Sequence, residues 1–141
     1  MDHAWTFEYS LECNASRQFA WAYWTNIANW KDGPAIFELD GPFAVGSKLT
    51  STLPGQTWHS SIRHVEPDRA ATIEMQLPDG VLTFHWTFED LPEARARITQ
   101  RLALSAANED LIAQAAVLEQ TVPQGMSRLI ATIQEAANSQ T

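Results

Sequence analysis

Residues 81–105 read VLTFHWTFED, LPEA and RARITQRLALS, two alternating runs of apolar and polar residues joined by a turn. Successive side chains of a β-strand point to opposite faces, so each run predicts a strand with one buried face and one wet face. The connecting residues Leu91-Pro92-Glu93-Ala94 fit a turn, because proline presets the backbone for a turn and cannot continue a central strand. The stretch therefore predicts an antiparallel hairpin made of Val81–Asp90 and Arg95–Ser105.

The same turn chemistry recurs upstream, at a spacing close to twelve residues. Three more turn signals are Pro54-Gly55, Glu66-Pro67-Asp68-Arg69 and Pro78-Asp79-Gly80. The alternating segments before and between them predict five more strands: Trp5–Cys13, Ile36–Asp40, Ser47–Leu53, Thr57–Val65 and Ala71–Leu77. Together with the hairpin they predict a curved antiparallel sheet of about seven strands.

A helical region follows the first strand. Asn14 or Ser16 can cap its N-terminus, since both side chains accept a hydrogen bond from a backbone N–H of the first turn. We expect two short helices with a break near Thr25-Asn26. The residues that end the region are Asn29, Asp32, Gly33 and Pro34.

A long helix is predicted at the C-terminal end. From Asn108 onward the apolar period changes from two to about 3.6 residues. The apolar positions form one stripe: Leu111, Ala115, Leu118, Val122, Met126, Leu129, Ile133 and Ala136. Pro123 lacks the N–H that would bond to the carbonyl of Glu119, and Gly125 follows, so we expect a kink or a break at 122–125.

The order of these elements is β-α-α-β6-α, which predicts an α+β fold in which the sheet wraps around the C-terminal helix. A length of 141 residues suits one domain, and no linker or repeat divides residues 1–141.

The chain resembles the START-like superfamily, which includes the birch-pollen allergen, polyketide cyclases and aromatase/cyclases (the SRPBCC proteins). The resemblance spans essentially the whole chain and is nearest to the polyketide cyclase/dehydrase-like branch. It is carried by Ser16-Arg17-Gln18-Phe19-Ala20-Trp21, Trp30, Gly41-Pro42-Phe43-Ala44-Val45-Gly46-Ser47 and Ile62-Arg63-His64-Val65-Glu66-Pro67-Asp68-Arg69. It implies a helix-grip fold with a pocket between the sheet and the long helix. These motifs are structural, so they indicate the fold and leave the chemistry open.

Composition excludes several classes of partner. The formal net charge is -8, so a nucleic acid, which needs a basic footprint, is a poor partner. No apolar run approaches the ~18 residues of a membrane span, and the first residues lack the basic region of a signal peptide. The single cysteine, Cys13, falls on the apolar side of its strand and is expected to be a buried thiol rather than a nucleophile. We expect a cytoplasmic protein.

The predicted pocket lies between the concave sheet face and the helix. Its candidate ligand-binding residues are Tyr9, Trp58, Ser60, Met75, Phe84, Trp86, Gln100, Leu118, Glu119 and Val122. Alternatively, the six tryptophans fill this space and leave no cavity. The Gln100 amide would bind a ligand oxygen, or would bond to Tyr9, Ser60 or a water. Glu119 would act as a base if it faced the pocket, and would otherwise point to solvent.

No metal or cofactor site is predicted. The histidines do not have a metal-ligand spacing, and His59 and His85 fall on the wet face of the sheet. There is no G-x-S-x-G nucleophile elbow and no glycine-rich phosphate loop.

Three functions remain open on the sequence. The first is a soluble protein that binds a hydrophobic, lipid-like or polyketide-like small molecule. The second is a polyketide cyclase or dehydratase in which Tyr9, Gln100 or Glu119 handles protons. The third is a ligand-free interaction module, such as a homodimer formed through the outer sheet face or the helix.

Overall fold

The computed structural model of the protein describes residues 4–30, 35–106 and 108–139. The elements follow one another along the chain as β1 (Trp5–Cys13), α1 (Arg17–Trp24), the short 3-10 helix η1 (Ile27–Asn29), β2 (Ile36–Leu39), β3 (Lys48–Leu53), β4 (Gln56–Glu66), β5 (Ala70–Leu77), β6 (Gly80–Leu91), β7 (Arg95–Ala106), α2 (Glu109–Ala116) and α3 (Leu118–Asn138). The predicted order of strands and helices is confirmed.

The strands form one antiparallel sheet of seven strands in the order β1-β7-β6-β5-β4-β3-β2. Each strand from β2 to β7 pairs with the next along the chain, and β1 closes the far side against β7. The β6–β7 hairpin has the longest register, from Gly80 opposite Ala106 to Leu91 opposite Arg95. One residue, Arg63, is extra in β4, because the register shifts between Ile62 and His64. A bulge of this kind bends a strand and increases the local twist.

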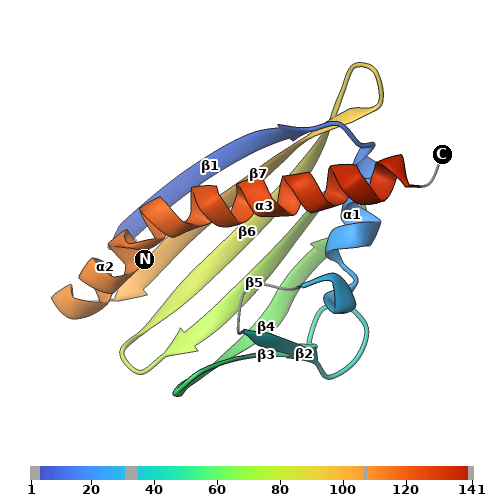
Figure 1. Ribbon diagram of the computed structural model, residues 1–141. Helices are drawn as coiled ribbons and strands as arrows, with labels where there is room; N and C mark the ends of the chain where they lie inside the picture. Colours follow the sequence, from blue (N-terminus) through green and yellow to red (C-terminus); the bar gives the residue numbers. More distant parts are fainter. Residues whose placement is uncertain (1–3, 31–34, 107, 140–141) are drawn as a thin grey trace.

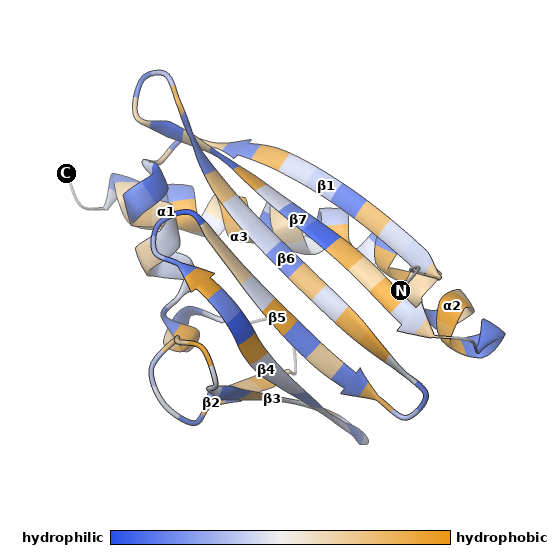
Figure 2. Cartoon of the chain, turned by 180° about the vertical axis from the view of Figure 1, so that it is seen from behind, coloured by the Kyte–Doolittle hydropathy of each residue, from blue (hydrophilic) through white to orange (hydrophobic). Residues whose placement is uncertain are grey.

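The helices lie on one face of the sheet, which is called the inner face here (Figure 1). The α3 helix runs across β1 and β7, with α2 at its start and α1 near its end. Seen from behind, β1, β7, β6 and β5 run side by side with no helix over them (Figure 2). The molecule is therefore two-layered, with one covered sheet face and one open sheet face.

Side-chain caps begin the first two helices, and the Ser16 cap is one of the two that the sequence predicts. Ser16 Oγ accepts a hydrogen bond of 3.1 Å from the Phe19 backbone N–H and starts α1. Asn26 Oδ1 accepts one of 3.1 Å from the Ala28 N–H and starts η1. The break predicted near Thr25-Asn26 is confirmed. The predicted terminators Asp32, Gly33 and Pro34 lie outside the described residues.

The break in the C-terminal helix lies earlier than the sequence suggests. The α2 helix ends at Ala116 and α3 begins at Leu118, while Pro123 lies inside a continuous α3. Of the two alternatives predicted at 122–125, a kink or a break, the break is therefore wrong. Pro123 is the sixth residue of α3, beyond the first four whose N–H groups have no partner within the helix. The helix therefore continues with one hydrogen bond missing, the one to the Glu119 carbonyl.

Two apolar clusters fill the layer between the sheet and the helices. The larger lies under α1 and most of α3, and includes the fully buried Ile98, Leu102 and Ile133. The smaller lies under α2 and is centred on Leu82, Leu104 and Ala115. The partly buried Trp5, Phe84 and Leu118 pack against both clusters and connect them.

Candidate functional site

An apolar cavity of about 240 Å³ opens between the sheet and the α2 end of the helical layer. Ten residues line it: Trp58, Met75, Leu77, Leu82, Phe84, Leu104, Leu111, Gln114, Ala115 and Leu118. Nine of these side chains are apolar or aromatic, and the tenth is the exposed amide of Gln114. A mainly apolar lining with one polar group is the usual composition of a small-molecule site.

The register of the sheet builds the floor of this cavity. Leu104 of β7 lies opposite Leu82 of β6, and Leu82 lies opposite Met75 of β5. Three apolar side chains on neighbouring strands therefore form one row on the inner face. Neighbouring strands lie about 4.8 Å apart, so the row spans the cavity floor.

The α2 helix and the start of α3 form the cover. Leu111, Gln114 and Ala115 come from α2, at spacings of three and four residues that share one helix face. The Asn108 side chain caps this helix by accepting a hydrogen bond of 2.8 Å from the Asp110 N–H. Ala115 is buried and small, so it leaves room where a larger side chain would close the space.

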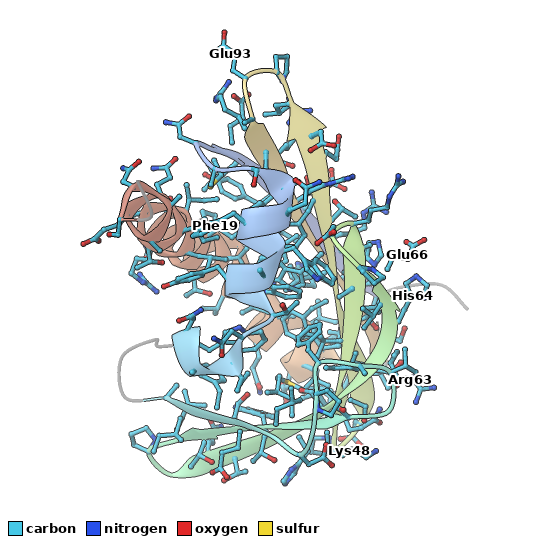
Figure 3. The ribbon with its side chains drawn as sticks, turned by 90° about the vertical axis from the view of Figure 1, so that its right-hand side faces the viewer. Phe19, Lys48, Arg63, His64, Glu66 and Glu93 are labelled. Atoms are coloured by element: carbon cyan, nitrogen blue, oxygen red, sulfur yellow. The ribbon has the colours of Figure 1, made fainter. Side chains whose placement is uncertain are left out.

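At the other end of the layer the space is filled by an aromatic cluster of Trp21, Trp24, Trp30, Phe37, Phe43, Trp86 and Phe88. Trp24 is central, with its ring centroid 4.8 Å from Trp86 and 5.1 Å from Phe43. Figure 3 shows side chains packed between α1 and the sheet at this end. The two alternatives raised by the sequence therefore hold at different ends: tryptophans fill one, and a cavity remains at the other.

Four of the predicted ligand-binding residues line the cavity: Trp58, Met75, Phe84 and Leu118. The other six lie outside its lining: Tyr9, Ser60, Trp86, Gln100, Glu119 and Val122. Trp86 belongs to the aromatic cluster, and Val122 is buried in the larger core.

Three buried polar side chains lie on the inner face, namely Ser51, Ser60 and Gln100. None of them makes a side-chain hydrogen bond to another residue in the described part of the chain. Gln100 lies between Tyr9 and Trp86 in the register, one row beyond Phe84. Buried amides normally have a partner, so Gln100 is suited to bond to water or to a ligand that extends past Phe84.

Glu119 is occupied by a contact outside the cavity. Its Oε2 accepts a hydrogen bond of 2.8 Å from the Trp5 indole Nε1, and the Glu119 side chain is exposed. The contact joins the first turn of α3 to the start of β1.

Two other titratable side chains, Cys13 and His85, lie outside the cavity lining. Burial raises the pKa of the Cys13 thiol to about 11, and the residue is fully buried. His85 lies on the outer face, where its Nδ1 is 2.8 Å from the Thr72 hydroxyl. Among the residues that the structure describes, no three His, Cys, Asp or Glu side chains are grouped so that they could hold a metal ion.

Sequence reasoning missed several lining residues: Leu77, Leu82, Leu104, Leu111, Gln114 and Ala115. Leu82 and Leu104 alternate in phase with Phe84, so the period-two pattern signals them. Leu111 and Ala115 belong to the apolar stripe of the C-terminal region. Gln114 carries no such signal, because a polar residue beside a helix stripe normally faces water.

No known protein-family pattern and no curated protein matches this sequence. Its structure is similar to several solved structures. Norcoclaurine synthase from Thalictrum flavum, solved in complex with dopamine and hydroxybenzaldehyde, superposes with a TM-score of 0.73 at 14% identity, over 92% of this chain and 85% of that one. A protein from Arthrobacter aurescens gives a TM-score of 0.66 at 21% identity, over 95% and 86%. Ara h 8.0201 gives 0.69 at 12% identity, over 96% and 98%.

At these identities the likeness concerns the fold. None of the described helices is both long enough and apolar enough to cross a membrane. The seven-stranded antiparallel sheet, the helices on one face and the long C-terminal helix together identify the α+β helix-grip fold, which norcoclaurine synthase and Ara h 8.0201 share.

Proposed function

We propose that this protein binds a compact hydrophobic small molecule in the cavity beneath α2. The observation that carries the proposal is an apolar space of about 240 Å³ bounded by nine apolar or aromatic side chains and one amide. Drug-sized sites range from about 300 to 1,000 Å³, while an engineered cavity of about 150 Å³ binds benzene. The volume therefore suits a molecule of one or two rings.

The fold supports the same size class. Norcoclaurine synthase, which shares this fold, was solved with dopamine and hydroxybenzaldehyde, and each of these has a single ring. The proposed ligand is defined by its chemistry alone, as a molecule that is apolar over most of its surface and has at most one polar group. That polar group would bond to the exposed Gln114 amide, or would extend past Phe84 to Gln100.

A cyclase or dehydratase is the second candidate that the resemblance suggests. It needs two polar side chains that converge on a substrate. The described lining offers the Gln114 amide and the Trp58 indole, and no ionisable side chain. This favours binding over proton transfer. A cytoplasmic location and a homodimer remain predictions from sequence.

The test is a titration with a polarity-sensitive dye, followed by displacement with small aromatic molecules. Ala115→Leu places three more carbon atoms in the cavity, and we expect it to reduce dye affinity at least about tenfold. Ala116→Leu is the matched control, because Ala116 is exposed on the same helix and does not line the cavity.

Circular dichroism and the melting temperature show whether each variant is folded. If folded Ala115→Leu protein binds the dye as the parent does, or if both variants lose binding equally, the cavity is not the site.

A further inference from the structure

The open face of the sheet contains a second, larger hollow of about 710 Å³, called the outer hollow here. A row of short side chains crosses the sheet at its floor: Ser10 of β1, Thr99 of β7, Thr87 of β6 and Ala70 of β5 lie opposite one another in turn. Longer charged side chains stand on both sides of this row. Glu8 lies opposite Arg101 on one side, and Arg97 opposite Glu89 on the other.

The hydroxyl groups on the floor of the outer hollow include O–H donors that no described protein group accepts. Ser10 Oγ and Thr99 Oγ1 are 2.7 Å apart, so one donates to the other and one O–H remains free. The Thr87 hydroxyl has no partner among the residues that the structure describes. At least two O–H donors therefore face the hollow.

Four arginines also line the hollow, and only Arg101 is well paired. It donates from Nε to Glu8 Oε2 at 2.8 Å, with a second contact at 2.7 Å. Arg97 lies 3.8 Å from Glu12 and 3.9 Å from Glu89, which is beyond hydrogen-bond distance.

The other two arginines have unused donors. Arg17 lies 3.4 Å from Asp90, and its Nε is buried with no hydrogen-bond partner. Arg69 makes no side-chain ion pair or hydrogen bond within the described chain.

The position of Arg69 is fixed by its backbone. Its N–H donates to the Glu66 carbonyl at 2.9 Å, and its carbonyl accepts from the Phe88 N–H at 2.7 Å. Arg69 thus stands beside Thr87, the residue before Phe88. In a chain with 17 acidic and 9 basic residues, an arginine that lines a hollow without a carboxylate partner is unexpected.

Four carboxylates also line the hollow, Glu8, Glu66, Glu89 and Asp90, and their formal charges balance those of the four arginines. Glu8 is held by Arg101. Glu66 lies 3.4 Å from His64 Nε2, and both of these side chains are labelled in Figure 3. An incoming anion would displace Asp90 from Arg17, and both Glu12 and Glu89 from Arg97.

We infer that the outer hollow binds a small phosphomonoester, whose phosphate is held by Arg69, Arg97 and the Thr87 hydroxyl. A phosphate offers several acceptor oxygens in a compact group, and arginine binds it with paired N–H donors. The hollow, at about 710 Å³, is about three times as large as the cavity of about 240 Å³ beneath α2, and its lining is mainly polar. It therefore suits a phosphate group that carries a polar organic part. The site is separate from the proposed hydrophobic site.

The experiment is an amide NMR titration with glycerol phosphate, inorganic phosphate or acetate, each compared with chloride at equal ionic strength. Saturable shifts are expected at Arg69, Thr87 and Thr99. Glycerol phosphate should bind at least as tightly as inorganic phosphate, and acetate about tenfold more weakly, because it has one charge and two oxygens. Absence of saturation, or equal binding of acetate, overturns the inference.

Variants distinguish a defined phosphate site from a general attraction of phosphate to positive charge. Arg69→Gln should weaken glycerol phosphate binding about tenfold, the loss of a charge-assisted contact. Arg63→Gln is the control, because Arg63 is an exposed arginine on the same sheet that does not line the hollow (Figure 3).

Glu89→Gln should tighten binding, because it removes one of the two carboxylates, Glu89 and Glu12, that compete for Arg97. Equal loss in Arg69→Gln and Arg63→Gln, or weaker binding in Glu89→Gln, contradicts the assignment. Ala115→Leu should leave phosphate binding unchanged, so this test does not depend on the cavity.

Discussion

The indole Nε1 of Trp5 donates a hydrogen bond of 2.8 Å to Oε2 of Glu119, across 114 residues of sequence. Trp5 begins β1, and Glu119 is in the first turn of α3, directly after the break at Val117. The bond therefore fixes the start of α3 to the sheet at the point where α2 turns away to cover the cavity.

Removing this acceptor should loosen the cover. Glu119→Ala is expected to lower the free energy of unfolding by about 1 kcal/mol, the usual contribution of one hydrogen bond. Glu119→Gln keeps a carbonyl acceptor and should lose less. Urea unfolding of both variants measures the difference. Unchanged stability in Glu119→Ala means that the bond contributes nothing in solution.

Two neighbouring aromatic residues on one face of β6 should respond differently to the same change. Trp86→Leu disrupts the aromatic cluster and should cost about 2 kcal/mol or more of stability, with dye binding retained. Phe84→Leu changes the cavity lining and should alter dye affinity. Denaturant unfolding and the dye titration report the two effects. Loss of dye binding in folded Trp86→Leu protein would move the ligand site toward α1.

Trp86 also shows which structural features can be predicted from the sequence and which cannot. Its alternation with Phe84 and Phe88 placed all three on the inner face, and the hairpin Val81–Asp90 and Arg95–Ser105 was predicted within a residue or so of β6 and β7. Alternation fixes the face of a side chain but not its neighbour in the opposite layer. Trp86 packs against Trp24 of α1, and the way α1 docks on the sheet determines this contact. Trp86 therefore belongs to the aromatic cluster and does not line the cavity beneath α2.

The helix break illustrates a second limit. Pro123 is the strongest local signal against a helix, whereas Val117 is an ordinary apolar residue. The structure breaks at Val117 because α2 turns to cover Leu82 and Leu104 while α3 follows β1. Tertiary packing decides this position, and no periodicity in the sequence encodes it.

Acidification should destabilise the protein through His85. Burial, followed by the charges of Arg101 and His64, lowers the pKa of His85 from 6.5, while Glu66 opposes this more weakly. The unfolded imidazole then takes a proton at higher pH than the folded one, so stability falls as the pH drops below 6.5. His85→Gln should flatten the stability profile between about pH 7 and 5. His59→Gln, at an exposed position, is the control, and an equal effect of both variants contradicts the assignment.

The Cys13 thiol should be inert in the folded protein. It is fully buried, and burial raises its pKa to about 11 from 9.0. A thiol reagent at pH 8 should therefore label native protein only at the rate of unfolding, and label denatured protein at once. Stability should also fall as the pH rises from 9.0 toward 11, because the unfolded thiol ionises first. Rapid stoichiometric labelling of native protein contradicts the burial of Cys13.

The most direct test of the binding proposal is a methyl NMR titration with indole, an apolar molecule whose two rings approach the size of the cavity. If indole enters beneath α2, the methyl signals of Met75, Leu82, Leu104, Leu111 and Leu118 shift and saturate, while those of Ile98 and Ile133 in the larger core do not. Ala115→Leu should abolish these shifts and Ala116→Leu should not. Saturable shifts confined to other methyl groups, or no saturable shift in the folded protein, would contradict the proposal that the cavity is a ligand site.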